Sequence, residues 1–183
     1  MEIVLVHPEI PHNTGCAARL AAALGLTLHL VQPLGFSLED RYLKRAGLDY
    51  WPLVELAVHR DWAAAAAGLG QGSERPLAQR LHLFTARGGT SLFETDFASD
   101  AVLVFGSEGS GLPAELIAHH PERRVRIPIR SGVRSLNLAN AVAVAVYTAL
   151  ARSGADLPEG DGSYLAHPHA ALDVRPADRL RTP

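Results

Sequence analysis

Short apolar runs alternate with helical segments along most of this 183-residue chain, and this alternation restricts its fold more than any other feature. Strand-like runs occupy residues 3–6, 27–31, 53–58, 81–85 and 101–105. Helical patterns occupy residues 16–24, 41–46, 62–67 and 136–151, and residues 68–80 have the composition of a loop. The alternation predicts an α/β fold with a mostly parallel sheet and helices on both of its faces.

The composition changes after residue 152, where Gly, Pro, Asp and Arg dominate and apolar periodicity fades. We therefore expect one domain over residues 1–152 and a poorly ordered tail over residues 153–183. The net charge of −2 argues against a general nucleic-acid coat but leaves room for a local basic patch. Lys44 is the only lysine among 17 basic residues, which reflects either phosphate recognition by arginine or genome composition.

A single cysteine, Cys16, excludes a disulfide within the chain and a cysteine-based metal site. The first residues begin a strand and lack the charged and apolar regions of a signal peptide. No apolar run reaches the roughly 20 residues that span a bilayer, so we expect a cytoplasmic protein with no membrane contact.

Three polar loops follow predicted strands, where open α/β sheets bind their ligands. The first, PEIPHNTG at residues 8–15, precedes the helix that carries Arg19, and Asn13 or Thr14 can cap that helix. The second, FGSEGSGLP at residues 105–113, has three glycines and a carboxylate, Glu108, that would repel phosphate. It lacks the Gly-Lys-Ser/Thr of a phosphate-binding loop and the Gly-x-Ser-x-Gly of a hydrolase.

The third loop, residues 127–140, runs directly into the longest apolar helix. Ser135 or Asn137 can cap this helix, and Asn140 follows Asn137 by three residues. Each loop also has an ordinary structural interpretation: a capped helix with a surface arginine, a tight turn with a solvated glutamate, and amides that bind loop backbone.

Together the three loops resemble the motifs of RNA 2′-O-ribose methyltransferases of the SPOUT superfamily. The segment RAGLDYW at residues 45–51 resembles the single-domain members that act on the wobble cytidine or uridine of tRNA. The resemblance covers residues 1 to about 151. It departs from the family pattern at His12, Cys16, Ser107 and Val133, which leaves the substrate preference open.

The resemblance implies a trefoil knot in the C-terminal half, S-adenosylmethionine as methyl donor without a metal, and a homodimer with shared active sites. The implied substrate is the anticodon loop of tRNA. Site roles carry over to three groups of residues, which are catalytic Arg19, Glu108 and Asn137, cofactor-binding Phe84, Gly106, Ile127 and Ser135, and substrate-binding Asn13, Arg41, Lys44, Arg45 and Arg134.

The identity of the general base stays open at this point. A guanidinium is effectively always protonated, so Arg19 is better suited to hold a phosphate and stabilise an oxyanion. Glu108 and Asn137 would fix Arg19 or the loops, or Glu108 would accept the proton. The alternatives are a related methyltransferase acting on another RNA such as rRNA, a noncatalytic RNA-binding module, and a nucleotide hydrolase, which the missing lysine disfavours.

Overall fold

The computed structural model describes residues 1–38, 51–71, 73–155, 157, 158, 160, 175 and 176. An eight-stranded sheet has the order β5-β7-β4-β6-β1-β2-β3-β8, and every pairing in it is parallel. The strands are β1 Glu2–Val6, β2 Thr27–Val31, β3 Leu56–His59, β4 Leu81–Phe84, β5 Thr90–Ser91, β6 Val102–Phe105, β7 Arg124–Arg126 and β8 Arg175–Pro176.

Helices cover both faces of this sheet, as the sequence predicts. Helices α1 (Pro11–Leu24) and α6 (Leu138–Ser153) cover one face. Helices α3 (Trp62–Leu69), α4 (Leu77–Arg80) and α5 (Ala114–His119) lie on the other. Three short 3-10 helices complete the described elements, η1 Trp51–Leu53, η2 Leu92–Glu94 and η3 Pro121–Arg123. None of the helices in this described part is long and apolar enough to cross a membrane.

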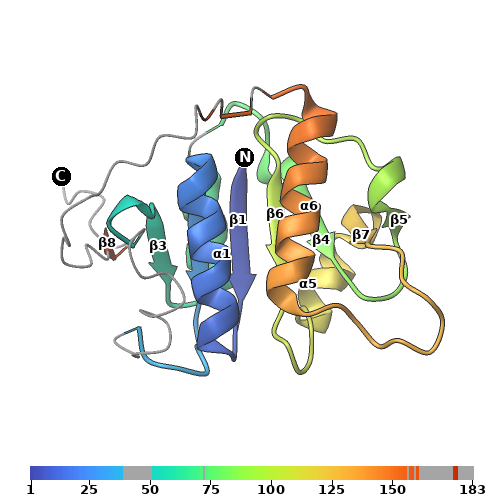
Figure 1. Ribbon diagram of the computed structural model, residues 1–183, viewed down its shortest axis with the longest axis horizontal. Helices are drawn as coiled ribbons and strands as arrows, with labels where there is room; N and C mark the ends of the chain where they lie inside the picture. Colours follow the sequence, from blue (N-terminus) through green and yellow to red (C-terminus); the bar gives the residue numbers. More distant parts are fainter. Residues whose placement is uncertain (39–50, 72, 156, 159, 161–174, 177–183) are drawn as a thin grey trace.

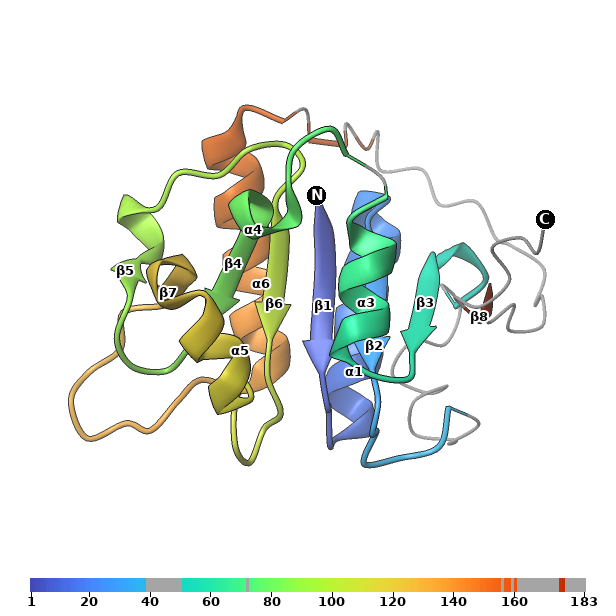
Figure 2. The ribbon, with the colours of Figure 1, turned by 180° about the vertical axis from the view of Figure 1, so that it is seen from behind.

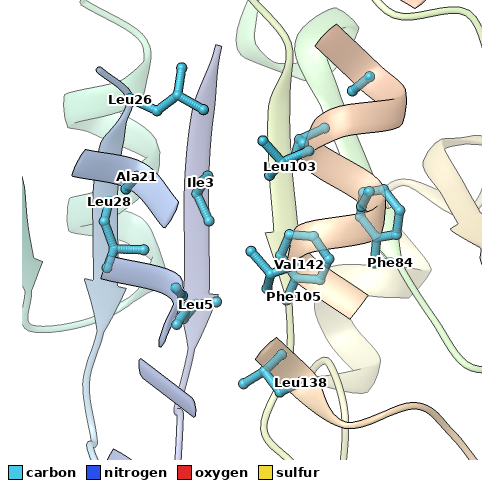
Figure 3. Close-up of a cluster of buried hydrophobic side chains, with 14 of the residues drawn as sticks. Ile3, Leu5, Ala21, Leu26, Leu28, Phe84, Leu103, Phe105, Leu138 and Val142 are labelled. Atoms are coloured by element: carbon cyan, nitrogen blue, oxygen red, sulfur yellow. The ribbon is translucent and has the colours of Figure 1, made fainter. Parts of the chain in front are cut away.

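Alternating side chains of the central strands build a separate core on each face. Ile3 and Leu5 of β1 pack on the side of α1 and α6, while Val4 and Val6 pack on the side of α3 and α5. Figure 3 shows the first core, in which Val142 of α6 lies against the sheet. Because both faces of β1 are buried, this strand reads as a continuous apolar run and not as an alternating one.

The sheet order changes direction between β1 and β6, which are neighbours although a hundred residues separate them. From β1 the chain builds outward through β2 and β3, whereas β4, β7 and β5 lie on the other side of β6. The loops that follow β1 and β6 therefore leave the same edge of the sheet in different directions. Such a switch point opens a crevice where parallel α/β sheets bind ligands.

Several predicted boundaries were wrong for identifiable reasons. Helix α1 begins at Pro11 and not at residue 16, because proline is well suited to the first turn of a helix. Asn13 and Thr14 consequently lie inside α1 and do not cap it; its N-cap is Ile10, which makes no side-chain cap bond. Asp61 does cap α3, by accepting a hydrogen bond from the Ala64 N–H at 2.8 Å.

Other boundaries shifted by a few residues. The third strand occupies Leu56–His59 and not residues 53–58, which begin inside η1. The predicted loop at 68–80 includes the end of α3 and the short helix α4. Helix α6 ends at Ser153, one residue beyond the predicted domain boundary, and Gly154 ends it in the left-handed conformation. The knot, the boundary and the poor order of the tail stay predictions, and the predicted helix at 41–46 lies outside the described residues.

A buried polar cluster lies on the α3 face of the sheet and joins β1, β2, β3 and α4. We call Glu2, His29, His59 and Arg80 the inner ion cluster. His29 Nδ1 lies 2.9 Å from His59 Nε2, and His29 Nε2 lies 3.0 Å from a Glu2 carboxylate oxygen. Arg80 Nη2 donates to the other Glu2 oxygen at 2.6 Å, and its remaining nitrogens donate to backbone carbonyls.

Burial shifts several titrating groups in this part of the protein. Burial lowers the pKa of His59, and the charge on His29 lowers it further. Burial alone would raise the pKa of Glu2, but the hydrogen bond and charge of His29, together with Arg80, outweigh burial and lower that pKa. On β4, burial lowers the pKa of His82 to about 4, and neighbouring arginines add to the shift.

Candidate active site

The three motif loops meet around one cavity of about 760 Å³ at the carboxyl end of the central strands. This volume lies within the range of pockets that hold small cofactors. Its lining includes every residue predicted to bind the cofactor, namely Phe84, Gly106, Ile127 and Ser135. It also includes Asn13, Glu108, Arg134 and Asn137. The sequence therefore identified residues from four separate segments that the fold brings to one place.

Glu108 binds the chain that enters α1. Its Oε2 accepts a hydrogen bond from the Glu9 N–H at 2.8 Å, and its Oε1 accepts from the Ile10 N–H at 3.3 Å. Oε1 also accepts from Nδ2 of Asn13 at 2.9 Å. A carboxylate is favourable beside the free N–H groups at a helix start, so Glu108 stabilises the start of α1 from another loop.

Asn13 continues this connection to the third motif. Its Oδ1 accepts a hydrogen bond from Nδ2 of Asn137 at 3.0 Å. Oδ1 of Asn137 in turn caps α6 by accepting from the Ala139 N–H at 3.0 Å and the Asn140 N–H at 3.4 Å. We call Glu108, Asn13 and Asn137 the loop clasp, because these three side chains join the three motif loops. Of the two predicted caps for α6, Asn137 is the one that caps it.

The glycine loop doubles back on itself, and this shape explains Gly106. A Cβ at residue 106 would lie 2.0 Å from the backbone carbon of Gly111 and 2.1 Å from the nitrogen of Leu112. Ser107 and Gly111 exchange two backbone hydrogen bonds, of 3.1 and 2.9 Å. Glycine is therefore required at residue 106 by the close approach of the chain itself, besides any approach of a ligand.

The cavity floor is apolar and belongs to the main core. Phe84 and Phe105, at the ends of β4 and β6, stack with their ring centroids 4.5 Å apart. Leu138, in the first turn of α6, is buried in the same core and also lines the cavity. A flat, apolar ligand portion fits such a floor, while polar loops supply hydrogen-bonding groups around it.

The remaining predicted site residues lie elsewhere or outside the description. Arg19 is exposed on α1 and is not among the residues that line the cavity. Arg41, Lys44 and Arg45 lie outside the described residues. Among the described residues, no group of three or more His, Cys, Asp or Glu side chains could hold a metal ion.

Sequence reasoning missed two charged residues near the cavity. Glu9 returns a bond to the glycine loop, because its Oε2 accepts from the Gly109 N–H at 3.1 Å. Arg87 lines the cavity from the segment that follows β4. The only signal for Arg87 was its place just after a predicted strand, since no motif includes it. For Glu9 the signal was its position within the first motif loop, where it is the second residue of the PEIP segment.

Fold and site together define an α/β enzyme with a cofactor cavity at the switch point of a parallel sheet. Residues 1–147 match the model of the SpoU rRNA Methylase family, and the chain belongs to this family. Over 153 residues it is 49% identical to the tRNA (cytidine(34)-2'-O)-methyltransferase of Burkholderia cenocepacia, covering 83% of this chain and 95% of the relative. The enzyme of that description from Aeromonas hydrophila is 45% identical over 148 residues, or 80% and 90% of the two chains.

Solved structures agree with this assignment. A structure concerned with the 2-OH methylation of C/U34 on tRNA has a TM-score of 0.75 at 48% identity, covering 82% of this chain and 94% of the other. A SpoU methyltransferase from Streptomyces viridochromogenes, solved with AdoMet, has a TM-score of 0.67 at 24% identity, covering 82% and 57%. At that identity the second likeness concerns the fold alone.

Proposed function

We propose that this protein transfers a methyl group from S-adenosylmethionine to the ribose 2′-oxygen of nucleotide 34, a cytidine or uridine, in tRNA. The observation that carries the proposal is the loop clasp, because it joins all three motifs around one cavity. The names of relatives that are nearly half identical over more than four fifths of this chain support the acceptor. The family's own description names rRNA, which makes rRNA the rival acceptor.

The cavity suits an adenosyl cofactor. Its stacked phenylalanines and Ile127 offer apolar contacts to a base, and the backbone groups that follow β4 and β7 can bind polar edges of that base. Ser135, which lines the cavity just before α6, offers a hydroxyl group to the ribose or the carboxylate. When bound, S-adenosylmethionine supplies a methyl group activated by a sulfonium, so the chemistry as proposed needs no metal.

The protein's part in the reaction is to position the acceptor and stabilise its charge. The acceptor oxygen forms a bond to the methyl carbon as the bond from carbon to sulfur breaks, and the hydroxyl proton is lost. We assign Arg19 to the neighbouring phosphate and to the charge that develops on the oxygen. We assign Glu108 a positioning role, because its two oxygens already accept three N–H donors. The proton then passes to water.

A homodimer would complete this site. Arg19 does not line the cavity of its own chain, so a twofold partner is one way to bring an arginine and a cofactor together. Val144 and Tyr147 of α6 are 40% and 50% exposed, which supports an interface on that helix. We expect a dimer by light scattering at micromolar concentration, in the cytoplasm where tRNA is modified, and a monomer would contradict the shared site.

The function is tested by asking which RNA accepts the methyl group. Purified protein is incubated with radiolabelled S-adenosylmethionine and either total tRNA or ribosomal RNA from cells that lack the protein. We expect label in the tRNA fraction alone, recovered after nuclease digestion as 2′-O-methylcytidine or 2′-O-methyluridine. Label confined to rRNA would favour the rival acceptor, and tight RNA binding without label would indicate a noncatalytic module.

A further inference from the structure

The cavity carries more uncommitted positive charge than its sequence motifs indicate. Arg87, Arg134 and Glu108 are the charged residues of its lining. Glu108 accepts three hydrogen bonds, as described above. Within the described part of the chain, the Arg87 and Arg134 side chains are exposed and have no hydrogen-bond or ion-pair partner. In contrast, the buried Arg80 is fully engaged in its cluster.

The segment that carries Arg87 has a fixed backbone. The Thr85 hydroxyl donates to the carbonyl oxygens of Arg87 at 2.9 Å and Gly88 at 3.3 Å. Gly88 and Gly89 both have positive φ, of 74° and 85°, and a Cβ at Gly89 would lie 2.4 Å from the carbonyl oxygen of Arg124. This tight turn holds the Arg87 backbone in place while its guanidinium stays free for a ligand.

We propose that Arg87 binds a backbone phosphate of the RNA substrate and acts together with Arg134 as a pair of phosphate-binding residues at the cavity. This inference rests on the proposed function and adds a residue to its substrate site. The segments that carry the two arginines lie at the same end of the sheet, one after β4 and the other after β7 (Figure 2). A guanidinium presents two parallel N–H donors that match a phosphate.

Two anions could meet Arg87, the RNA phosphate and the carboxylate of the cofactor. The geometry favours phosphate because both arginines are exposed, where a polymer backbone could pass, whereas the buried phenylalanines would offer the small cofactor an apolar floor. The cofactor also carries a sulfonium and an ammonium, so two uncommitted cations would oppose its binding. The RNA backbone carries only negative charge, so each guanidinium that it contacts increases its binding affinity.

The test compares Arg87→Ala with Arg60→Ala, which removes an exposed guanidinium that directly follows β3, pairs with Asp61 at 3.3 Å and is not among the residues that line the cavity. Binding of an anticodon stem-loop RNA is titrated at several salt concentrations, and binding of S-adenosylmethionine is measured by calorimetry. In Arg87→Ala we expect RNA affinity to fall about tenfold, as for one lost charge-assisted contact. The plot of log K against log salt concentration has a negative slope, and the magnitude of this slope should decrease by about 0.7. Cofactor affinity should stay within twofold of wild type, and Arg60→Ala should resemble wild type throughout.

Three results decide the proposal. A reduced salt slope in Arg87→Ala and in Arg134→Ala, with a larger reduction in the double variant, supports it. Weaker cofactor binding with an unchanged salt slope overturns it and assigns Arg87 to the cofactor carboxylate. Unchanged binding of both ligands also overturns it. The proposed function is judged separately, by methyl transfer in the wild type, so either idea can fail while the other stands.

Discussion

The inner ion cluster and the loop clasp both connect distant segments through charged and amide side chains, but they differ in burial and in what surrounds them. Arg80 is 2% exposed and donates to Glu2 and to two backbone carbonyls, so this guanidinium is already committed within the protein. The three residues of the loop clasp instead line the cavity. Arg87 and Arg134, which are uncommitted, line the same cavity. The polar side chains on the α3 face therefore stabilise the fold, whereas those at the switch point position the loops around the cavity.

The largest expected effect comes from breaking the inner ion cluster. Arg80→Met removes the buried guanidinium from Glu2 and leaves His29 as the remaining partner of that carboxylate, which should lower the free energy of unfolding by about 3–5 kcal/mol. The control Arg60→Met, at a side chain that is 76% exposed, should change it by less than about 1 kcal/mol. Urea unfolding followed by circular dichroism measures both, and equal effects would mean that the inner ion cluster has no special role in stability.

The next effect concerns Arg19 of α1, the helix whose start the loop clasp holds. Arg19→Ala should reduce single-turnover methyl transfer by about 10²–10³-fold at saturating tRNA, as for loss of one transition-state donor. Cofactor affinity should stay near that of wild type. If the defect disappears at high tRNA concentration, Arg19 only binds substrate. Arg19→Lys should rescue poorly, because an ammonium lacks the planar fork.

Acid should weaken the fold through its buried histidines. The folded pKa of His82 is about 4 against 6.5 for the free side chain, so the unfolded chain binds more protons between these values. The free energy of unfolding should therefore fall as pH falls from 6.5 to 4, by on the order of 3 kcal/mol for this residue, and His59 acts in the same direction. His82→Gln should flatten this dependence, whereas exposed His119→Gln should not. An equally steep profile in His82→Gln would count against the assignment.

The smallest of these effects tests whether Asn13 binds substrate or positions the loops. Asn13→Asp places a second carboxylate where Glu108 now accepts a hydrogen bond at 2.9 Å. We expect the methyl-transfer rate at saturation to fall by roughly 10–100-fold, the range for a misplaced site, with little change in tRNA affinity. Asn140→Asp, at an exposed residue of α6, is the control. A loss confined to tRNA affinity would support the substrate-binding role that the sequence predicts.

The sequence was informative where function depends on local patterns. The glycine loop and the segments around Asn13 and Asn137 follow predicted strands or precede a predicted helix, so their meeting at the strand ends could be expected. The start of α1 was misplaced because Pro11 reads equally well as part of a loop.

The inner ion cluster could not have been predicted. Arg80 and Glu2 are 78 residues apart, and each looks like an ordinary surface charge in the sequence. The closed form of the glycine loop, which makes glycine necessary at residue 106, depends on a three-dimensional contact with Gly111 and Leu112. Pairings of this kind follow from strand order, which a single sequence does not contain.

Removal of the 2′-hydroxyl from nucleotide 34 tests directly whether its ribose accepts the methyl group. Two tRNA transcripts are prepared that differ only in which nucleotide lacks its 2′-hydroxyl, nucleotide 34 in one and a neighbouring anticodon-loop nucleotide in the other. Each is incubated with the protein and labelled S-adenosylmethionine. We predict that the transcript with a 2′-deoxynucleotide at 34 accepts no methyl group while the other is methylated like the unmodified tRNA. Undiminished methylation of the first transcript would contradict ribose 34 as the acceptor.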